Sequence, residues 1–237
     1  MNKKILLPLA LIVLLLSACT VVRGSGDVET ETRAVSSFDQ VSLSGQGELI
    51  LTQGDQESLE IEAEDNIIAV LESDVRGNTL YIGAQDRTTI RPTEPVRFYL
   101  TMAEISGLEV SGVGTIIADN VVTDRLALDV SGAGDIDIDS LSADSLTVDI
   151  SGAGGVNMAG QAANQVIDIS GSGEYQAADL ESETADIEVS GAGEATVWAS
   201  QTLNVDISGS GSVDYYGNPA VTQDISGVGE LNNLGER

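Results

Sequence analysis

The sequence predicts an all-β protein folded as a parallel β-helix (solenoid) with rungs of 18–20 residues. Three observations predict it: a motif that recurs at a nearly fixed period, an alternation of apolar and polar residues around that motif, and glycines where the chain must bend. The motif is Ser-Gly-x-Gly. It starts at Ser44, and it recurs at Ser111, Ser131, Ser151, Ser170, Ser190, Ser208 and Ser226. From Ser111 onward the spacings are 20, 20, 19, 20, 18 and 18 residues. A fixed period of this kind indicates a stack of similar structural units.

Aliphatic residues precede every copy of the motif. The residue before the serine is β-branched, which favours a strand; these residues are Val110, Val130, Ile150, Ile169, Val189, Ile207 and Ile225. A second apolar column lies two residues earlier and comprises Leu108, Leu128, Val148, Ile167, Ile187 and Val205, before it ends at the polar Gln223. We expect equivalent residues to stack about 4.8 Å apart, one rung above the next. The polar Gln223 predicts that the stack ends near it.

An acidic residue separates the two apolar columns in each of the seven copies from Ser111 onward. This acidic column consists of Glu109, Asp129, Asp149, Asp168, Glu188, Asp206 and Asp224. Because side chains alternate between the two faces of a strand, these carboxylates are expected to point outward. Two interpretations stay open. The first is a solvated acidic face, screened by salt. The second is calcium binding by Asp129, Asp149, Asp168, Glu188, Asp206 and Asp224, because calcium takes several carboxylate oxygens. No other cofactor is predicted.

The alternation resumes after the glycines. The inward residues there are Ile116, Ile136, Val156, Tyr175, Ala195, Val213 and Leu231, followed two residues later by Ala118, Ile138, Met158, Ala177, Val197 and Tyr215. Each rung is therefore expected to hold two strands joined through Gly-x-Gly and a shorter third side of turn residues. The glycines have the inward parity, where the chain bends and no side chain fits inside the corner.

Residues 35–105 are less regular, but they alternate in the same way. Within each of the segments "GELILTQG", "LEIEA", "TLYIG" and "VRFYLT", the apolar residues fall on one parity. These residues are Leu49, Leu51, Leu59, Ile61, Leu80, Ile82, Val96, Phe98 and Leu100. We expect irregular first rungs or a mixed β cap here, with one short helical turn that begins at Asp65. Regular repeats then fill residues 106–234, so residues 35–234 are predicted to form a single domain.

The first residues are predicted to lie outside the fold. "MNKKILLPLALIVLLLSAC" has a basic start, an apolar run of signal-peptide length and small residues before Cys19. Its end, "LSAC", resembles the lipobox of bacterial lipoproteins. That resemblance implies a lipoprotein signal peptide over residues 1–18 and lipid on Cys19, which would bind the protein to a membrane. Thr20, in place of Asp, favours the outer membrane in a cell that has one.

Residues 19–34 are predicted to be the lipidated cysteine and a flexible tether, because "TVVRGSGDVETETRA" is polar and mixed. Without residues 1–18 the chain has 8 Arg, no Lys and 38 acidic residues, a net charge of 8 − 38 = −30. Such a charge excludes a protein that tracks nucleic-acid phosphates. Cys19 is the only cysteine, so no disulfide within the chain is expected.

A family resemblance rests on the order of several segments. "RAVSSFDQVSLSGQGELILTQGD", "EAEDNI", "GNTLYI" and "PVRFYLT" are followed by serial "VSGxG" repeats. In this order the chain, over roughly residues 33–232, resembles the head GIN domain family of auto-transporter adhesins. The resemblance implies a right-handed β-helix that is secreted or lipid-anchored, and it carries over no catalytic residue. We expect no long C-terminal barrel segment of the auto-transporter kind, and we expect lipid on Cys19 to serve as the anchor in its place.

Enzymatic interpretations find little support in the sequence. The chain has no His, and the repeated Ser lacks the G-x-S-x-G context of a nucleophile. A strand, and not a helix, follows each Gly-x-Gly, which argues against a phosphate loop. Asp135, Asp137 and Asp139 are candidate acids for a polysaccharide-cleaving β-helix. However, rungs of 18–20 residues leave no loops to wall a cleft, and aromatic residues make up only 3% of the chain.

Three functional hypotheses follow. The favoured one is a non-enzymatic, lipid-anchored adhesin-like module of the cell envelope, with an envelope polysaccharide or another surface ligand as its partner. The second is a structural periplasmic lipoprotein without a specific ligand. The third is a polysaccharide-active enzyme that uses Asp137.

Overall fold

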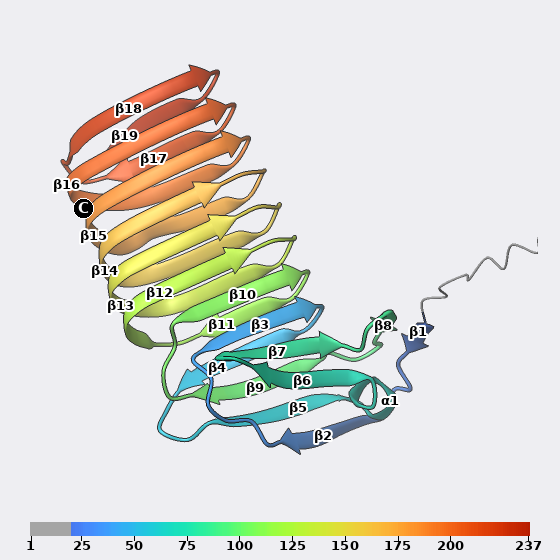
Figure 1. Ribbon diagram of the computed structural model, residues 1–237. Coiled ribbons are helices and arrows are strands. Elements are labelled where there is room, and N and C mark those ends of the chain that lie inside the picture. Colours follow the sequence, from blue (N-terminus) through green and yellow to red (C-terminus); the bar gives the residue numbers. More distant parts are fainter. Residues whose placement is uncertain (1–19) are drawn as a thin grey trace, which may run out of the picture.

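The computed structural model describes residues 20–237, which form a tall β-solenoid of about six turns on a mixed β base (Figure 1). The all-β parallel solenoid predicted from the repeats is confirmed; its right hand stays a prediction. The base holds β1(Thr20–Arg23), β2(Val28–Arg33), β3(Gln40–Gly45), β4(Glu48–Gln53), β5(Ser58–Glu64), α1(Asp65–Ile68), β6(Leu71–Arg76), β7(Thr79–Ala84), β8(Thr88–Arg91) and β9(Arg97–Met102). None of the helices in residues 20–237 is long and apolar enough to cross a membrane.

The solenoid rises from this base. It holds β10(Gly107–Gly112), β11(Thr115–Ala118), β12(Val121–Val130), β13(Asp135–Ile150), β14(Gly155–Ile169), β15(Glu174–Gly191), β16(Glu194–Gly209), β17(Ser212–Tyr216), β18(Ala220–Gly227) and β19(Glu230–Gly235). All neighbouring strands of this part pair in parallel. Two faces therefore rise along the stack. One begins with β10 and continues through the C-terminal parts of β12 and of the long strands above it. The other begins with β11 and continues through the N-terminal parts of β13 and of the long strands above it.

The predicted columns are confirmed by the strand registers. Val110 pairs with Val130, Val130 with Ile150, and the series continues without a slip to Ile225. On the second face Ile116, Ile136 and Val156 follow one another in the same way. These residues are buried up to Ile207 and Val213. Stacked aliphatic residues thus form one continuous core, which no disulfide supports.

Rung order in space differs from chain order at the base. β3 and β4 form a complete rung around the first Ser-Gly-x-Gly, yet the rung above them is β10 and β11. The rung below them is β7 and β9, which come later in the chain than β3 and β4. Antiparallel β6 then extends β7, while β5 and β2 extend β9. Residues 35–105 therefore supply both a true rung and a mixed cap, and the helical turn predicted at Asp65 is confirmed as α1.

From β12 to β16 the third side of the rung is a strand and not a turn, which corrects the prediction. Val121 pairs with Leu141, and Ala143 pairs with Ala162, so the ladder runs on through this side. Register shifts interrupt it near residues 138–141, 157–159 and 177–184. The side looked irregular in the sequence because these bulges absorb the difference between rungs of 18, 19 and 20 residues.

Both glycines of each motif leave no room for a Cβ. The second, such as Gly154, is buried, and a Cβ there would lie 2.0 Å from the carbonyl oxygen of Gly134 in the rung below and 2.7 Å from a γ-carbon of Val130. This agrees with the predicted crowding inside the corner. The first, such as Gly152, is half-exposed, and its Cβ would lie 2.0 Å from the carbonyl oxygen of Gly132 in the rung below. Both glycines therefore serve the approach of stacked backbones, which the prediction did not include.

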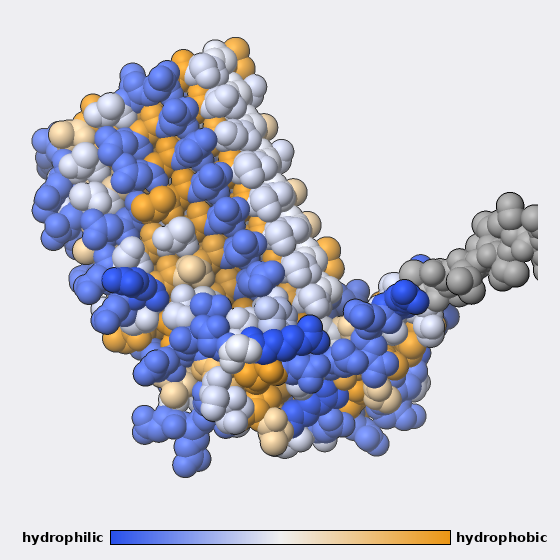
Figure 2. All heavy atoms as spheres, in the orientation of Figure 1, coloured by the Kyte–Doolittle hydropathy of each residue, from blue (hydrophilic) through white to orange (hydrophobic). Residues whose placement is uncertain are grey.

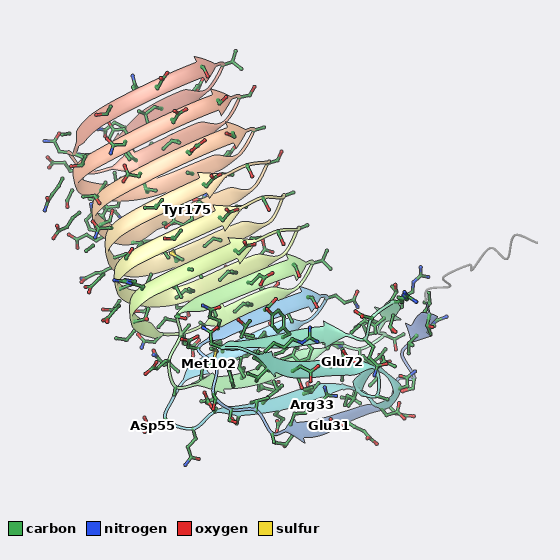
Figure 3. All side chains as sticks on the ribbon, viewed as in Figure 1. Glu31, Arg33, Asp55, Glu72, Met102 and Tyr175 are labelled. Carbon is green, nitrogen blue, oxygen red and sulfur yellow. The ribbon has the colours of Figure 1, made fainter. Side chains whose placement is uncertain are left out.

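The predicted flexible tether over 19–34 is wrong for residues 20–33. β1 pairs with β8, and β2 pairs antiparallel with β5 from Val28↔Glu64 to Arg33↔Leu59. Arg33 donates to the carbonyl oxygens of Leu71 (2.9 Å) and Ile68 (3.2 Å), and it contacts Glu31 on the same strand (Figure 3). The segment is polar because β2 is an edge strand with nearly all of its side chains exposed. Polar composition at an edge strand resembles that of a linker.

The two ends of the stack differ. At the base, acidic β2 protects one edge with charge, as natural edge strands do. At the top, β18 is exposed along most of its length, and Gln223 faces solvent at the position where lower rungs bury aliphatic residues. The stack therefore ends where the polar Gln223 predicted.

Candidate functional site

The acidic column lies where the sequence placed it. Glu109, Asp129, Asp149, Asp168, Glu188, Asp206 and Asp224 are neighbours in register along one face. Hydrophilic columns of this kind follow the stack from rung to rung (Figure 2). Partial burial raises the pKa of Asp129, and the charges of Asp149 and Glu109 raise it further. The column is thus a line of mutually repelling carboxylates.

Calcium binding by this column stays a prediction. Within residues 20–237, no group of three or more His, Cys, Asp or Glu side chains is placed so that it could hold one metal ion. Consecutive carboxylates belong to consecutive rungs, about 4.8 Å apart. They stand in a line and do not converge on one point, whereas calcium takes six to eight oxygens around it.

The adjacent rungs do not place a second carboxylate opposite Asp137, the central one of the three candidate hydrolase acids. Asp135, Asp137 and Asp139 lie along β13, with Asp137 between Ile117 and Asn157 in the adjacent rungs. The Asp135 carboxylate accepts a hydrogen bond from the backbone N–H of Gly155 (2.9 Å). Neighbouring rungs therefore bring no second carboxylate to Asp137.

The third side of the solenoid is hollowed into a groove. This third-side groove spans five rungs, from β12 to β16, and encloses about 600 Å³. Its lining is Val122, Thr123, Asp124, Ser142, Ala143, Asp144, Gln161, Ala162, Ala163, Glu181, Ser182, Glu183 and Ser200. A second hollow continues it toward the base, past Ser106 and Gln53. The charged residues of the groove are acidic, and Arg125 lies in the hollow nearer the base.

Small side chains make the groove shallow and even. Ala143, Ala162, Ser182 and Ser200 supply its floor from successive rungs. The two serines are engaged with the chain itself, since Ser182 donates to the carbonyl oxygen of Trp198 (2.7 Å) and Ser200 to that of Ser182 (2.9 Å). Their hydroxyls therefore serve as structural bonds and not as nucleophiles. The groove was missed from the sequence, although the recurrence of small residues on the third side was a usable signal.

A polar pair lies inside the apolar core. The Tyr175 hydroxyl donates to Oε1 of the buried Gln165 (2.7 Å) and contacts Sδ of Met158 (3.6 Å). Burial raises the pKa of Tyr175, whose side chain lies within the solenoid (Figure 3). Gln165 Nε2 has no hydrogen-bond partner. Sequence analysis identified Tyr175 as inward but missed Gln165.

A buried carboxylate attaches the N-terminal segment to the base. Glu64 accepts hydrogen bonds from the backbone N–H of Gly26 (2.7 Å), from the N–H of Thr93 (2.9 Å) and from the Thr93 hydroxyl (2.6 Å). The Thr93 hydroxyl lowers the pKa of Glu64, its burial opposes this, and the backbone donors lower it further. Glu64 was missed because its burial depends on contacts with the predicted tether.

Fold and surface together define a β-solenoid with grooved, acidic flanks and, in residues 20–237, no group of three or more His, Cys, Asp or Glu placed to hold a metal ion. The chain belongs to the family described as "Putative auto-transporter adhesin, head GIN domain", whose model matches residues 37–219. A search of the curated proteins finds no match. The resemblance seen in the sequence is thereby confirmed.

Several solved structures share the fold. A putative adhesin from Bacteroides fragilis is 26% identical, with a TM-score of 0.86 over 90% of this chain and 100% of that one. A putative lipid binding protein from Parabacteroides distasonis is 23% identical, with a TM-score of 0.78 over 91% of this chain and 100% of its own. A putative adhesin from the same organism is also 23% identical, with a TM-score of 0.73 over 90% and 100%. The family and two of these neighbours are described as putative adhesins and the third as a putative lipid binding protein, and none of these descriptions names an enzyme.

The predicted lipidation site lies outside the described residues. Cys19 and the predicted signal peptide over 1–18 precede Thr20, where the description begins. Lipid attachment and membrane location therefore stay predictions.

Proposed function

We propose that this chain is a non-enzymatic binding module of the cell envelope, anchored by lipid on Cys19 and adhesin-like in its action. The observation that carries the proposal is the placement of the N-terminal segment. Thr20, the residue after Cys19, belongs to β1, which pairs with β8 at the base (Figure 1). The last rung lies at the opposite end of the solenoid, and the C-terminal Arg237 reaches back to Asp179 on β15.

This placement favours an upright module over a loosely tethered one. Because β1 and β2 are strands of the base, no long linker separates Cys19 from the folded body. Lipid on Cys19 would hold the base at the membrane surface and leave the rungs projecting from it. Six steps between Glu109 and Asp224, at about 4.8 Å each, place the top of the acidic column roughly 29 Å above its bottom.

The third-side groove is the proposed ligand site. It runs along the stack, so it suits an extended ligand such as an envelope polysaccharide or a surface polymer. Its carboxylates Asp124, Asp144, Glu181 and Glu183 would disfavour polyanions and leave neutral or cationic chains as partners. Thr20, in place of Asp, after Cys19 favours the outer membrane.

The anchor and the orientation are tested on cells. The mass of the mature protein reveals whether Cys19 carries acyl chains, and a Cys19→Ser variant is expected to lose membrane fractionation. Protease added to intact cells is expected to degrade the solenoid if the module faces outward. A protein that stays protected would favour the second hypothesis, a structural lipoprotein of the periplasm.

Ligand binding is tested with a glycan array and two substitutions. Ala163→Trp places a bulky ring in the groove, whereas Ala133→Trp places the same ring at an exposed corner outside it. Binding that the first variant loses and the second retains would support the groove. Depolymerisation of an acidic glycan by the purified protein, abolished by Asp137→Asn, would instead favour the enzyme hypothesis.

A further inference from the structure

A separate hollow, distinct from the third-side groove and its continuation and here called the base pocket, lies where the solenoid meets its base. Gly45, Leu71, Ala84, Ile90, Phe98 and Val113 line it, and it encloses about 260 Å³. These residues come from the two lowest Ser-Gly-x-Gly corners and from β6, β7, β8 and β9. Unlike the third-side groove, the base pocket has a largely apolar lining and no Asp, Glu, Lys or Arg in it.

Local geometry keeps the base pocket open. Gly45 has a φ of 90°, and a Cβ there would have no atom within 4 Å, so this corner faces empty space. Val113 stands at the next corner with 62% of its surface exposed. At about 260 Å³ the base pocket is smaller than typical pockets for small molecules, and its apolar lining suits a segment of an apolar chain.

The base pocket lies beside the point where the predicted lipid would be attached. Thr20 pairs with Thr88, which also lines the pocket, and the Thr20 N–H donates to the carbonyl oxygen of Arg87 (2.9 Å). Cys19 directly precedes Thr20 in the chain, and consecutive Cα atoms are about 3.8 Å apart. An acyl chain on Cys19 would thus start one residue before Thr20, and Thr20 lies one strand spacing from Thr88 in the pocket lining.

We propose that the base pocket binds a segment of an acyl chain carried by Cys19. The inference rests on the proposed lipidation. Its physical basis is tethering, because a ligand on a short linker meets its site at an effective concentration in the millimolar range. The pocket covers only part of a long acyl chain, whereas a bilayer buries all of it. The segment therefore occupies the pocket when the protein is in water and leaves it when the chain enters a membrane.

The pocket is tested first with a free probe. Residues 20–237 contain every described strand and the whole core, so this chain is used with the fluorescent fatty acid 11-(dansylamino)undecanoic acid. We expect one saturable site. Val113→Asp, which puts a charge at the rim, is expected to weaken binding at least tenfold.

A matched variant separates pocket binding from binding at any corner. Ala133 has the same place in the next motif, is exposed, and lies outside the pocket. Both residues donate their N–H to a glycine of the rung below, at 2.7 Å in each case. Ala133→Asp is therefore expected to leave probe binding unchanged. The absence of saturable binding, or an equal loss in both variants, would overturn the proposal; Ala84→Phe, which fills the pocket, gives a second test should Val113→Asp fold poorly.

The tethered occupant is tested through the only cysteine in the chain. In the chain 19–237, a dodecyl maleimide on Cys19 is expected to weaken probe binding at least tenfold, because the attached chain takes the pocket. N-ethylmaleimide adds the same head group without the long chain and is expected to have no effect. Equal probe binding after both treatments would overturn the proposed occupant. Because the chain is attached chemically, this result does not depend on whether cells lipidate Cys19, which the mass of the mature protein decides separately.

Discussion

Replacing Gly152 by alanine tests whether the repeated glycines are required by the stacking of backbones. A Cβ at this position would lie 2.0 Å from the carbonyl oxygen of Gly132, far inside ordinary contact distance. Relief requires the two rungs to separate by more than about 1 Å at this corner. The bonds from Ala153 N–H to Gly132 (2.8 Å) and from Ser151 N–H to Val130 (2.9 Å) would then exceed hydrogen-bond length.

The expected loss of stability follows from these two bonds. Each is worth about 1 kcal/mol net, with a further cost of about 1–3 kcal/mol where a polar group stays unsatisfied. Alanine also restricts the unfolded chain, which offsets roughly 0.4–1 kcal/mol. We therefore expect a net loss of roughly 2–5 kcal/mol. For a domain of this size, about 2–4 °C per kcal/mol corresponds to a melting temperature lower by about 4–20 °C.

Gly155→Ala is the matched control, three residues further along the same chain. Its Cβ would meet Oδ1 of Asp135 at 3.2 Å, the end of a flexible side chain that can move aside. Thermal unfolding followed by circular dichroism is expected to place this variant within about 1 kcal/mol of the parent protein. If Gly152→Ala lost no more stability than Gly155→Ala, the stacking argument would be refuted.

Four further changes test the core, the base and the acidic column. Tyr175→Phe is expected to lower the free energy of unfolding by about 1–2 kcal/mol, because both polar ends of Gln165 are then unpaired; adding Gln165→Leu should recover that loss in urea unfolding. Glu64 has a lowered pKa, so its contribution to stability is complete above its ordinary value of 4.5 and is lost as the pH falls through its folded-state pKa. The melting temperatures of the parent and Glu64→Gln should accordingly converge as the pH is lowered from 6 toward 3, and a constant gap would contradict this. Asp129 has a raised pKa, so its ionisation disfavours the fold, and Asp129→Asn should raise the melting temperature at pH 7 but not at pH 3. Finally, if the acidic column binds calcium, calcium should raise the melting temperature more than sodium does at equal ionic strength, and equal curves would reject the site.

The repeats made most of the solenoid predictable. Once Val130 and Ile150 are recognised as equivalent, the period fixes which residues stack, which point inward and which acids form a line. The registers of seven copies confirm this because one slipped residue would send every apolar side chain outward. Repetition therefore carries information about tertiary contacts that a single strand pattern lacks.

Features without repetition were not predictable in the same way. β2 reads as a linker because both of its faces are exposed, and only its pairing with β5 makes it a strand. The position of β3 and β4 above β7 and β9 depends on long-range pairing that no local pattern encodes. The burial of Glu64 and the base pocket likewise depend on contacts between segments far apart in the chain, so both were missed.

The copies from Ser131 upward present nearly the same upper and lower contour to their neighbours. A Cβ at the first glycine of each would meet the glycine carbonyl below it at 2.0–2.4 Å, from Gly132 to Gly227. A whole coil is thus an interchangeable part: its removal or duplication would join surfaces that already fit, without disturbing the base or the last coil. Gain or loss of one coil would move the tip by about 4.8 Å. The number of repeats in the gene therefore sets how far this protein extends.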